Sequence, residues 1–174
     1  LGGPKADAIT ASLTQLLAAQ GLTVGTHDRK GVHVGGETIV SGDVPILRAG
    51  RMLTMDRRVE ALVFGVIDVG VARQGLPIQK IDALLITGDA PAEPRAGGTA
   101  EPFRAEALHL IAPHCRSVAA LAELDEFDPQ VRAALARRKI DRVVPAAEHA
   151  SFFRSVAKGV TIAAHKARGT LTDS

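Results

Sequence analysis

The pattern of apolar and polar positions predicts a regular series of elements in the first part of the chain. Between residues 6 and 20, apolar side chains recur at helical spacing, and a glycine follows as a stop signal. Residues 22–26 are predicted to form a short strand, and residues 31–40 a β-hairpin that turns at a Gly-Gly pair. Residues 46–55 are a second candidate helix.

The strongest strand predictions are two uninterrupted apolar runs, residues 60–67 and residues 82–87. Runs of this kind are typical of strands that are buried on both faces of a parallel sheet. Residues 69–76, which lie between them, are predicted to form a short helix or crossover. Residues 90–102 are polar and rich in Pro and Gly, so they are predicted to form a loop.

Helices and strands then alternate up to residue 164. The predicted helices cover residues 103–112, 128–139 and 149–157, and the predicted strands cover residues 116–121, 142–146 and 159–164. Strands that alternate with helices of about ten residues imply βαβ units. The predicted fold is therefore α/β, an open, mainly parallel sheet flanked by helices, with one domain over residues 1–164 and a frayed tail over residues 165–174.

Composition excludes several classes of partner. The 174 residues are 46% hydrophobic and suit one globular domain, but they include only five Phe and no Trp or Tyr. Aromatic platforms for stacking bases are therefore scarce, and 21 basic against 19 acidic residues leave a net charge of only +2, so no nucleic-acid partner is expected. No apolar run approaches the roughly 20 residues that span a bilayer, so no membrane partner is expected either.

The thiol and imidazole groups show no catalytic or metal-binding pattern. The single cysteine, Cys115, excludes an internal disulfide and fits a cytoplasmic location. A Cys115–His114 nucleophile is possible in principle, but a small buried thiol at the start of a strand explains this cysteine better. No two of the six histidines have the spacing of a helical zinc motif. They are His27, His33, His109, His114, His149 and His165.

The first residues stand where a phosphate-binding loop would lead into a helix. They read Leu1-Gly2-Gly3-Pro4-Lys5-Ala6-Asp7. Such a loop uses glycines to bring backbone N–H groups to the phosphates, and it adds a lysine and a hydroxyl that holds Mg²⁺. Here the lysine is kept as Lys5, whereas Pro4 has no N–H to donate and Ala6 has no hydroxyl.

Longer segments carry a family resemblance. They are residues 21–25 and 31–36, Ser41-Gly42-Asp43, residues 49–53, residues 60–64, residues 73–76, residues 82–87 and residues 124–129. In order and in sequence, these segments resemble the central domain of the Mur ligase superfamily, and within it they are most similar to the C-terminal half of cyanophycin synthetases. The resemblance implies an ATP- and Mg²⁺-dependent ligase that forms an amide through an acyl phosphate, with a separate ATP-grasp half.

The departures from the family pattern fall on the residues that the chemistry needs. The family's loop reads G-T-N-G-K-T-T, and its metal-coordinating hydroxyl falls on Ala6. Its metal-binding glutamate falls on Gly65, and the arginine of its following A-R-G-G turn falls on Asp68. The Thr-Asn pair after the next strand becomes Thr87-Gly88, and the downstream histidine has no equivalent. Together these losses predict negligible catalysis by the family's mechanism.

Three functions follow from this pattern as hypotheses. The first is a catalytically silent module of a cyanophycin-synthetase-like protein, with no cofactor, that supports an upstream ATP-grasp-type region or a homo-oligomer. The second is a divergent ATP-dependent amide ligase that uses ATP and Mg²⁺ at a site around Lys5, Asp68 and Asp89. The third is a regulatory module that binds an anion or nucleotide at a vestigial phosphate loop formed by Gly3 and Lys5.

The sequence lacks the strand that is expected to lead into the phosphate loop. In a doubly wound sheet that strand is central, and the chain starts after it would have ended. Since the first residue is Leu1 rather than methionine, we expect a piece of a longer polypeptide. An upstream segment would then supply the central strand; the alternative is a sheet that is built without it.

Overall fold

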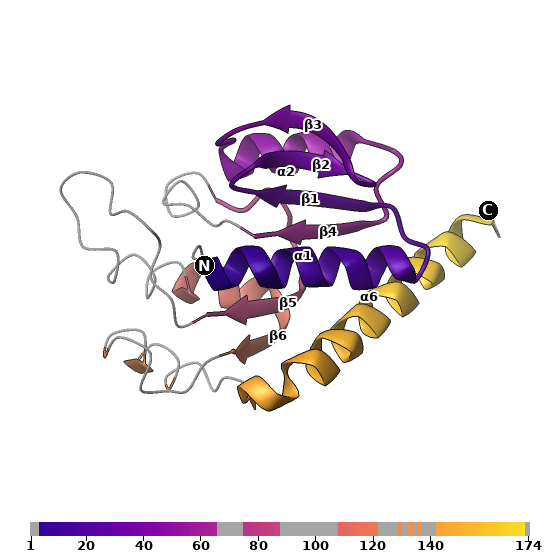
Figure 1. Cartoon of the computed structure of the whole chain (residues 1–174). Coiled ribbons are helices and arrows are strands. Elements are labelled where there is room, and N and C mark those ends of the chain that lie inside the picture. Colours follow the sequence, from indigo (N-terminus) through magenta and orange to yellow (C-terminus); the bar gives the residue numbers. More distant parts are fainter. Residues whose placement is uncertain are drawn as a thin grey trace.

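The structure is a computed structural model of the whole chain (Figure 1). It describes residues 4–65, 75–87, 108–121, 129, 132–133, 136 and 142–172. Over these residues the fold is α/β, with strands gathered into two sheets and helices packed on their faces. The predicted fold class is confirmed at this level, although the described strands form two sheets rather than one.

The first sheet has four strands in the spatial order β3-β2-β1-β4. Its strands are β1 (Val24–Asp28), β2 (Gly31–Val34), β3 (Glu37–Ser41) and β4 (Ala61–Phe64). The strands β1, β2 and β3 run antiparallel to one another in sequence order, whereas β4 runs parallel to β1. The predicted hairpin is thus confirmed, and its turn is made by Gly35 and Gly36, which both have positive φ.

The second sheet has three strands, all parallel, in the order β5-β6-β7. Its strands are β5 (Ile81–Ile86), β6 (Cys115–Ala120) and β7 (Arg142–Val143). Residues 108–111 are helical and are followed by the 3₁₀ turn η1 (Ala112–His114), which leads directly into β6. Leu108 and Ile111 are fully buried and pack against Leu84 and Ile86 of β5.

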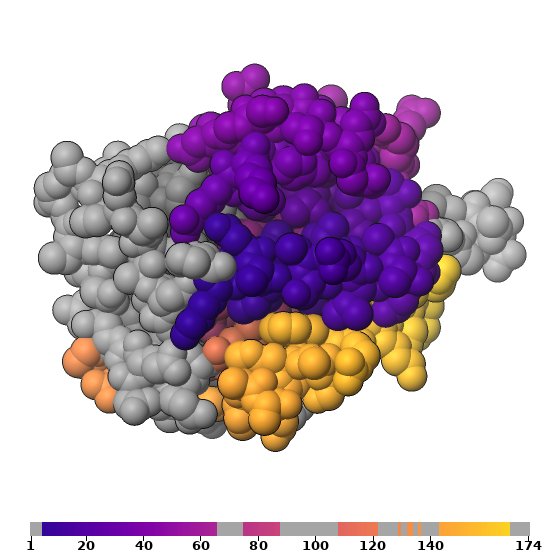
Figure 2. Space-filling view, in the orientation of Figure 1, coloured from indigo at the N-terminus to yellow at the C-terminus, as the bar shows by residue number. Residues whose placement is uncertain are grey.

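Helices cover both faces of the first sheet. On one face lies α2 (Ile46–Met55), whose Ala49 and Leu53 pack against Val32 and Val34. On the other face lies α1 (Pro4–Ala19), and beside it α6 (His149–Thr172), which follows the 3₁₀ turn η3 (Ala146–Glu148). Figure 2 shows α1 and α6 side by side on the surface of the molecule, in indigo and in orange to yellow.

The helix α1 confirms the prediction for residues 6–20, and its end explains why β1 starts late. The N–H of Leu22 donates to Leu17 O at 3.3 Å, and the N–H of Gly21 donates to Ala18 O at 2.9 Å. This is a Schellman motif, with Gly21 at a φ of 81°. Because these residues close the helix, the strand predicted for 22–26 begins at Val24 instead.

The prediction of a strand at residues 159–164 is wrong. The helix α6 continues through this segment and on to Thr172, across the residues for which a frayed tail was expected. Ala157, Val160 and Ala164 lie on one helical face and pack on the cluster that contains Leu17 and Ala61. Helical spacing of the buried side chains therefore outweighs the strand propensity of the β-branched residues in this segment.

The remaining predictions are shortened or fall outside the described residues. The strand predicted for 142–146 is the two-residue β7. Within 128–139, residues 129, 132–133 and 136 are helical, and the rest lie outside the described residues. Residues 69–74, the loop 90–102 and residues 103–107 lie outside them as well, while residues 75–76 are not helical. No helix among the described residues is both long and apolar enough to span a membrane.

Candidate functional site

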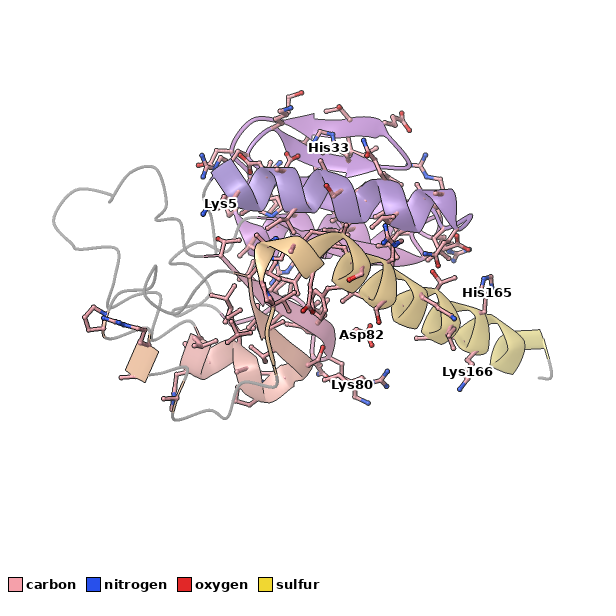
Figure 3. All side chains as sticks on the ribbon, turned by 60° about the horizontal axis from the view of Figure 1, so that its bottom comes forward. Lys5, His33, Lys80, Asp82, His165 and Lys166 are labelled. Carbon is pink, nitrogen blue, oxygen red and sulfur yellow. The ribbon has the colours of Figure 1, made fainter. Side chains whose placement is uncertain are left out.

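The predicted phosphate-binding position lies at the start of α1. Lys5 is exposed in the first turn of α1, and Figure 3 labels it at the start of that helix. Asp7 follows, and its Oδ2 lies 3.8 Å from Nε of Arg29. An acid in the first turn stabilises the helix dipole, and it repels a phosphate at the same point. Gly3, the other predicted residue, lies outside the described residues.

Ala6 and Thr10 face inward from the first turns of α1. Ala6 is 6% exposed and Thr10 is 4% exposed. The Oγ1 of Thr10 donates to Ala6 O at 2.8 Å, one helical turn back. Ala6, on which the resemblance is expected to place a metal-coordinating hydroxyl, is therefore a buried methyl group.

The end of β4 lies directly under this part of α1. The N–H of Gly65 donates to His27 O at 2.7 Å, which extends the β1–β4 pairing by one residue. A Cβ at Gly65 would lie 3.0 Å from Cγ2 and 3.1 Å from Cβ of Thr10, and would overlap its Oγ1. There is no space for a side chain at Gly65, the position on which the resemblance is expected to place a metal-binding glutamate.

The other predicted site residues are not brought together by anything the structure describes. Thr87 follows β5 and is buried. Asp68, Gly88 and Asp89 lie outside the described residues, so the acidic site proposed around Lys5, Asp68 and Asp89 stays a prediction. Within the described ranges, no group of three or more His, Cys, Asp or Glu side chains could hold a metal ion.

The cysteine has no feature of an activated nucleophile. Cys115 is half-buried at the start of β6, and its Sγ lies 3.3 Å from Ile111 O, to which the thiol donates. Burial raises the pKa of the Cys115 thiol to about 11. Reactive cysteines have pKa values that are shifted in the opposite direction, so the structural interpretation of this residue is supported.

Three histidines make contacts that hold local structure. His27 is 2% exposed, and its Nε2 donates to Val44 O at 2.7 Å, which ties the loop before α2 to β1. His33 Nδ1 lies 3.1 Å from Thr38 Oγ1, across the hairpin. His149 Nε2 donates to Val144 O at 3.0 Å, at the start of α6. Each of these contacts gives its histidine a structural role.

A cavity that the sequence did not reveal lies between the two sheets. It has a volume of about 470 Å³ and runs between β4 and β5, under α1 and α6. Most of its lining residues are aliphatic, and they include residues of both strands. The only signal in the sequence was that residues 60–67 and 82–87 both have the composition of central strands.

Comparison with known proteins gives no matching family model and no matching curated protein.

Proposed function

We propose that this chain is a catalytically silent, Mur ligase-like module of a cyanophycin-synthetase-like protein. It acts as a scaffold, as an oligomerisation surface or as a support for an ATP-grasp-type partner region. The α/β fold, with β4 parallel to β1 and with α1 lying over the strand ends, is compatible with the frame that this resemblance requires.

The observation that carries the proposal is the contact between Gly65 and Thr10. In the family that the chain resembles, the corresponding strand end presents a carboxylate to Mg²⁺. Here the space that such a side chain would need is filled by Thr10 from α1. A metal bridging phosphate oxygens needs charged or hydroxyl oxygen ligands, and neither Gly65 nor Ala6 has a side chain that provides one.

Isothermal titration calorimetry with ATP, with and without Mg²⁺, tests the silent-module proposal. We expect no saturable heat in either case, and the same result for the Lys5→Ala variant. Saturable, Mg²⁺-dependent ATP binding that Lys5→Ala weakens would reject the proposal. If substrate-dependent ADP release accompanied that binding, the divergent ligase would be the better interpretation.

Thermal unfolding in phosphate distinguishes the silent module from the anion-binding alternative. A ligand that binds only the folded state raises the melting temperature by mass action. We expect equal melting temperatures in phosphate and in chloride buffers of matched ionic strength. A rise in phosphate that disappears in Lys5→Ala would favour the regulatory anion-binding module instead.

The scaffold role is tested by removing the module. Deletion of residues 4–172 from the parent polypeptide should lower the melting temperature or the subunit number of the remainder, measured by light scattering after size exclusion. Unchanged assembly and stability of the remainder would contradict the scaffold role, whatever the result with ATP.

A further inference from the structure

The cavity between the sheets has the length of a β-strand. Its lining includes Glu60 and Lys80, which directly precede β4 and β5, and Gly65 and Thr87, which directly follow them. The cavity therefore extends along both strands from end to end. Figure 3 shows Lys80 well away from Lys5. This agrees with an arrangement in which β4 and β5 begin at one end of the cavity and α1 begins at the other.

Both strands that border the cavity lie at the edge of their sheet. The strand β4 pairs with β1 alone and β5 pairs with β6 alone among the strands that the structure describes. Their sequences have the composition of strands that are buried on both faces of a parallel sheet. Val63, Phe64 and Leu85 are only partly buried, and they line the cavity.

The hydrogen-bonding groups of β4 show which residues face the cavity. The N–H groups of Ala61 and Gly65 donate to carbonyls of β1 and the residue before it. Because strand residues alternate in the direction of their N–H and C=O groups, Leu62 and Phe64 direct theirs away from β1 and toward the cavity.

The strand β5 presents a matching row from the other side. Ile86 O accepts from the N–H of Leu121, just beyond β6, so Ile86 and the residues in phase with it face β6. Ala83 and Leu85 are out of phase and direct their N–H and C=O groups toward the cavity. Two rows of backbone donors and acceptors thus face each other across an apolar space.

We propose that an extended apolar segment leading directly into α1 occupies this cavity as a strand, parallel to both β4 and β5. Only an extended backbone offers N–H and C=O groups alternately to two facing strands. A strand in this place would join the two sheets into one. The proposal holds whether or not the chain binds a nucleotide.

The position of α1 fixes the direction of the segment and its source. Thr10 packs on Gly65, so the first turns of α1 lie at the carboxyl ends of the strands (Figure 1). A strand parallel to β4 would end at this same edge, within a short turn of Pro4. The helix α1 would then return across the sheet, as the helix of a βαβ unit does.

The test is a five-residue extension of alternating valine and isoleucine placed ahead of Leu1. The matched control replaces the second and fourth residues by proline, which has no N–H to donate and disrupts strand pairing. A version with threonine in place of valine keeps the β-branched character and is more soluble, so it serves if the first extension aggregates. The readout is amide hydrogen exchange measured by NMR.

We expect the valine or threonine extension to slow exchange at the cavity-facing amides by at least about tenfold, and the proline control to leave them unchanged. These amides are Leu62, Phe64, Ala83 and Leu85. The amides of Ala61 and Val63, which face β1, should change less. Equal exchange with all extensions would overturn the proposal. A dimeric native chain in which these four amides are already protected would overturn it in favour of a second copy.

Discussion

At the scale of single residues, the contact between Thr10 and Gly65 decides what the end of β4 can hold. The sequence shows a glycine at position 65, where the resemblance leads us to expect a carboxylate. That Thr10 fills the space is not visible, since it depends on how α1 packs across the sheet. Local patterns define each element, but they do not define which side chains meet between two elements.

A double-mutant cycle measures this contact. Gly65→Ala should lower the free energy of unfolding by about 1–3 kcal/mol, because the new methyl group is forced into Thr10. In a Thr10→Ala background the same change should cost less than about 1 kcal/mol, because the overlapping Oγ1 is gone. Urea unfolding of the four proteins gives the coupling. Additive effects of the two substitutions would contradict the packing described at this strand end.

The Cys115 thiol should react slowly with iodoacetamide. Its pKa is raised to about 11 from a reference value of 9.0, so at pH 8 the reactive thiolate is about 100-fold scarcer than in the unfolded chain. We expect alkylation of the native protein to be slower by about this factor than alkylation in urea, and to accelerate up to pH 11. Rapid alkylation at pH 8 would mean that the thiol is activated.

The raised pKa of Cys115 also has a consequence for stability. The folded state holds the proton more tightly than the unfolded state, so this contribution is complete below pH 9 and is lost as pH rises toward 11. Stability should therefore fall over this alkaline range more in the native protein than in a Cys115→Ala variant. Urea titrations at pH 8 and pH 10.5 make the comparison.

At the scale of elements, helices with strong local signals were predictable, and the helix predicted for 149–157 is confirmed by the start of α6, whereas the extension of α6 to Thr172 was not predicted. Residues 46–55 are helical as predicted, because their apolar spacing is unambiguous. A strand was predicted for residues 159–164 as part of the regular alternation of helices and strands, and the β-branched run Val-Thr-Ile at residues 160–162 would itself favour extended backbone. The burial of Ala157 and its packing partners on α1 instead stabilise one continuous helix.

Two glycines in helices give opposite predictions for the same substitution. Gly159→Ala should raise the free energy of unfolding by about 0.5–1 kcal/mol, because this position in α6 has open space around it. Gly50→Ala in α2 should lower it by about 1–3 kcal/mol, because a Cβ there would overlap the ring of Pro77. Urea unfolding measures both. Destabilisation by Gly159→Ala would show that residues 159–164 are not helical in solution.

At the scale of the whole molecule, the sequence predicted parallel strands but not the way in which they are grouped. The predicted runs at 60–67 and 82–87 overlap the strands β4 (Ala61–Phe64) and β5 (Ile81–Ile86). Among the strands that the structure describes, however, β4 and β5 face each other across a cavity instead of pairing with neighbours on both sides. Strand composition reports burial, and burial does not identify the partner. The two sheets are connected through the helices α1 and α6, whose side chains pack on strands of both sheets.

Phe153 on α6 is the side chain that best tests whether the helices connect the two sheets. It is 8% exposed, and it packs in a cluster with Leu121 and Val144 beside the second sheet and with Leu13 of α1. Phe153→Ala should lower the free energy of unfolding by about 3–5 kcal/mol, because it removes a large apolar group and leaves a cavity. Ile162→Ala, on the same helix but 48% exposed, is the matched control and should change stability by less than about 1 kcal/mol.

Hydrogen exchange in the Phe153→Ala variant shows whether the two sheets unfold together. Because α1 packs both on this cluster and on Val24 and Ala61 of the first sheet, loosening α6 should weaken both sheets. We therefore expect protection to fall by a similar factor in β1 and in β6. A loss confined to β6 would show that the sheets are separate cooperative units. In that case the two helices cover the sheets without coupling them, and the second sheet can open while the first stays folded.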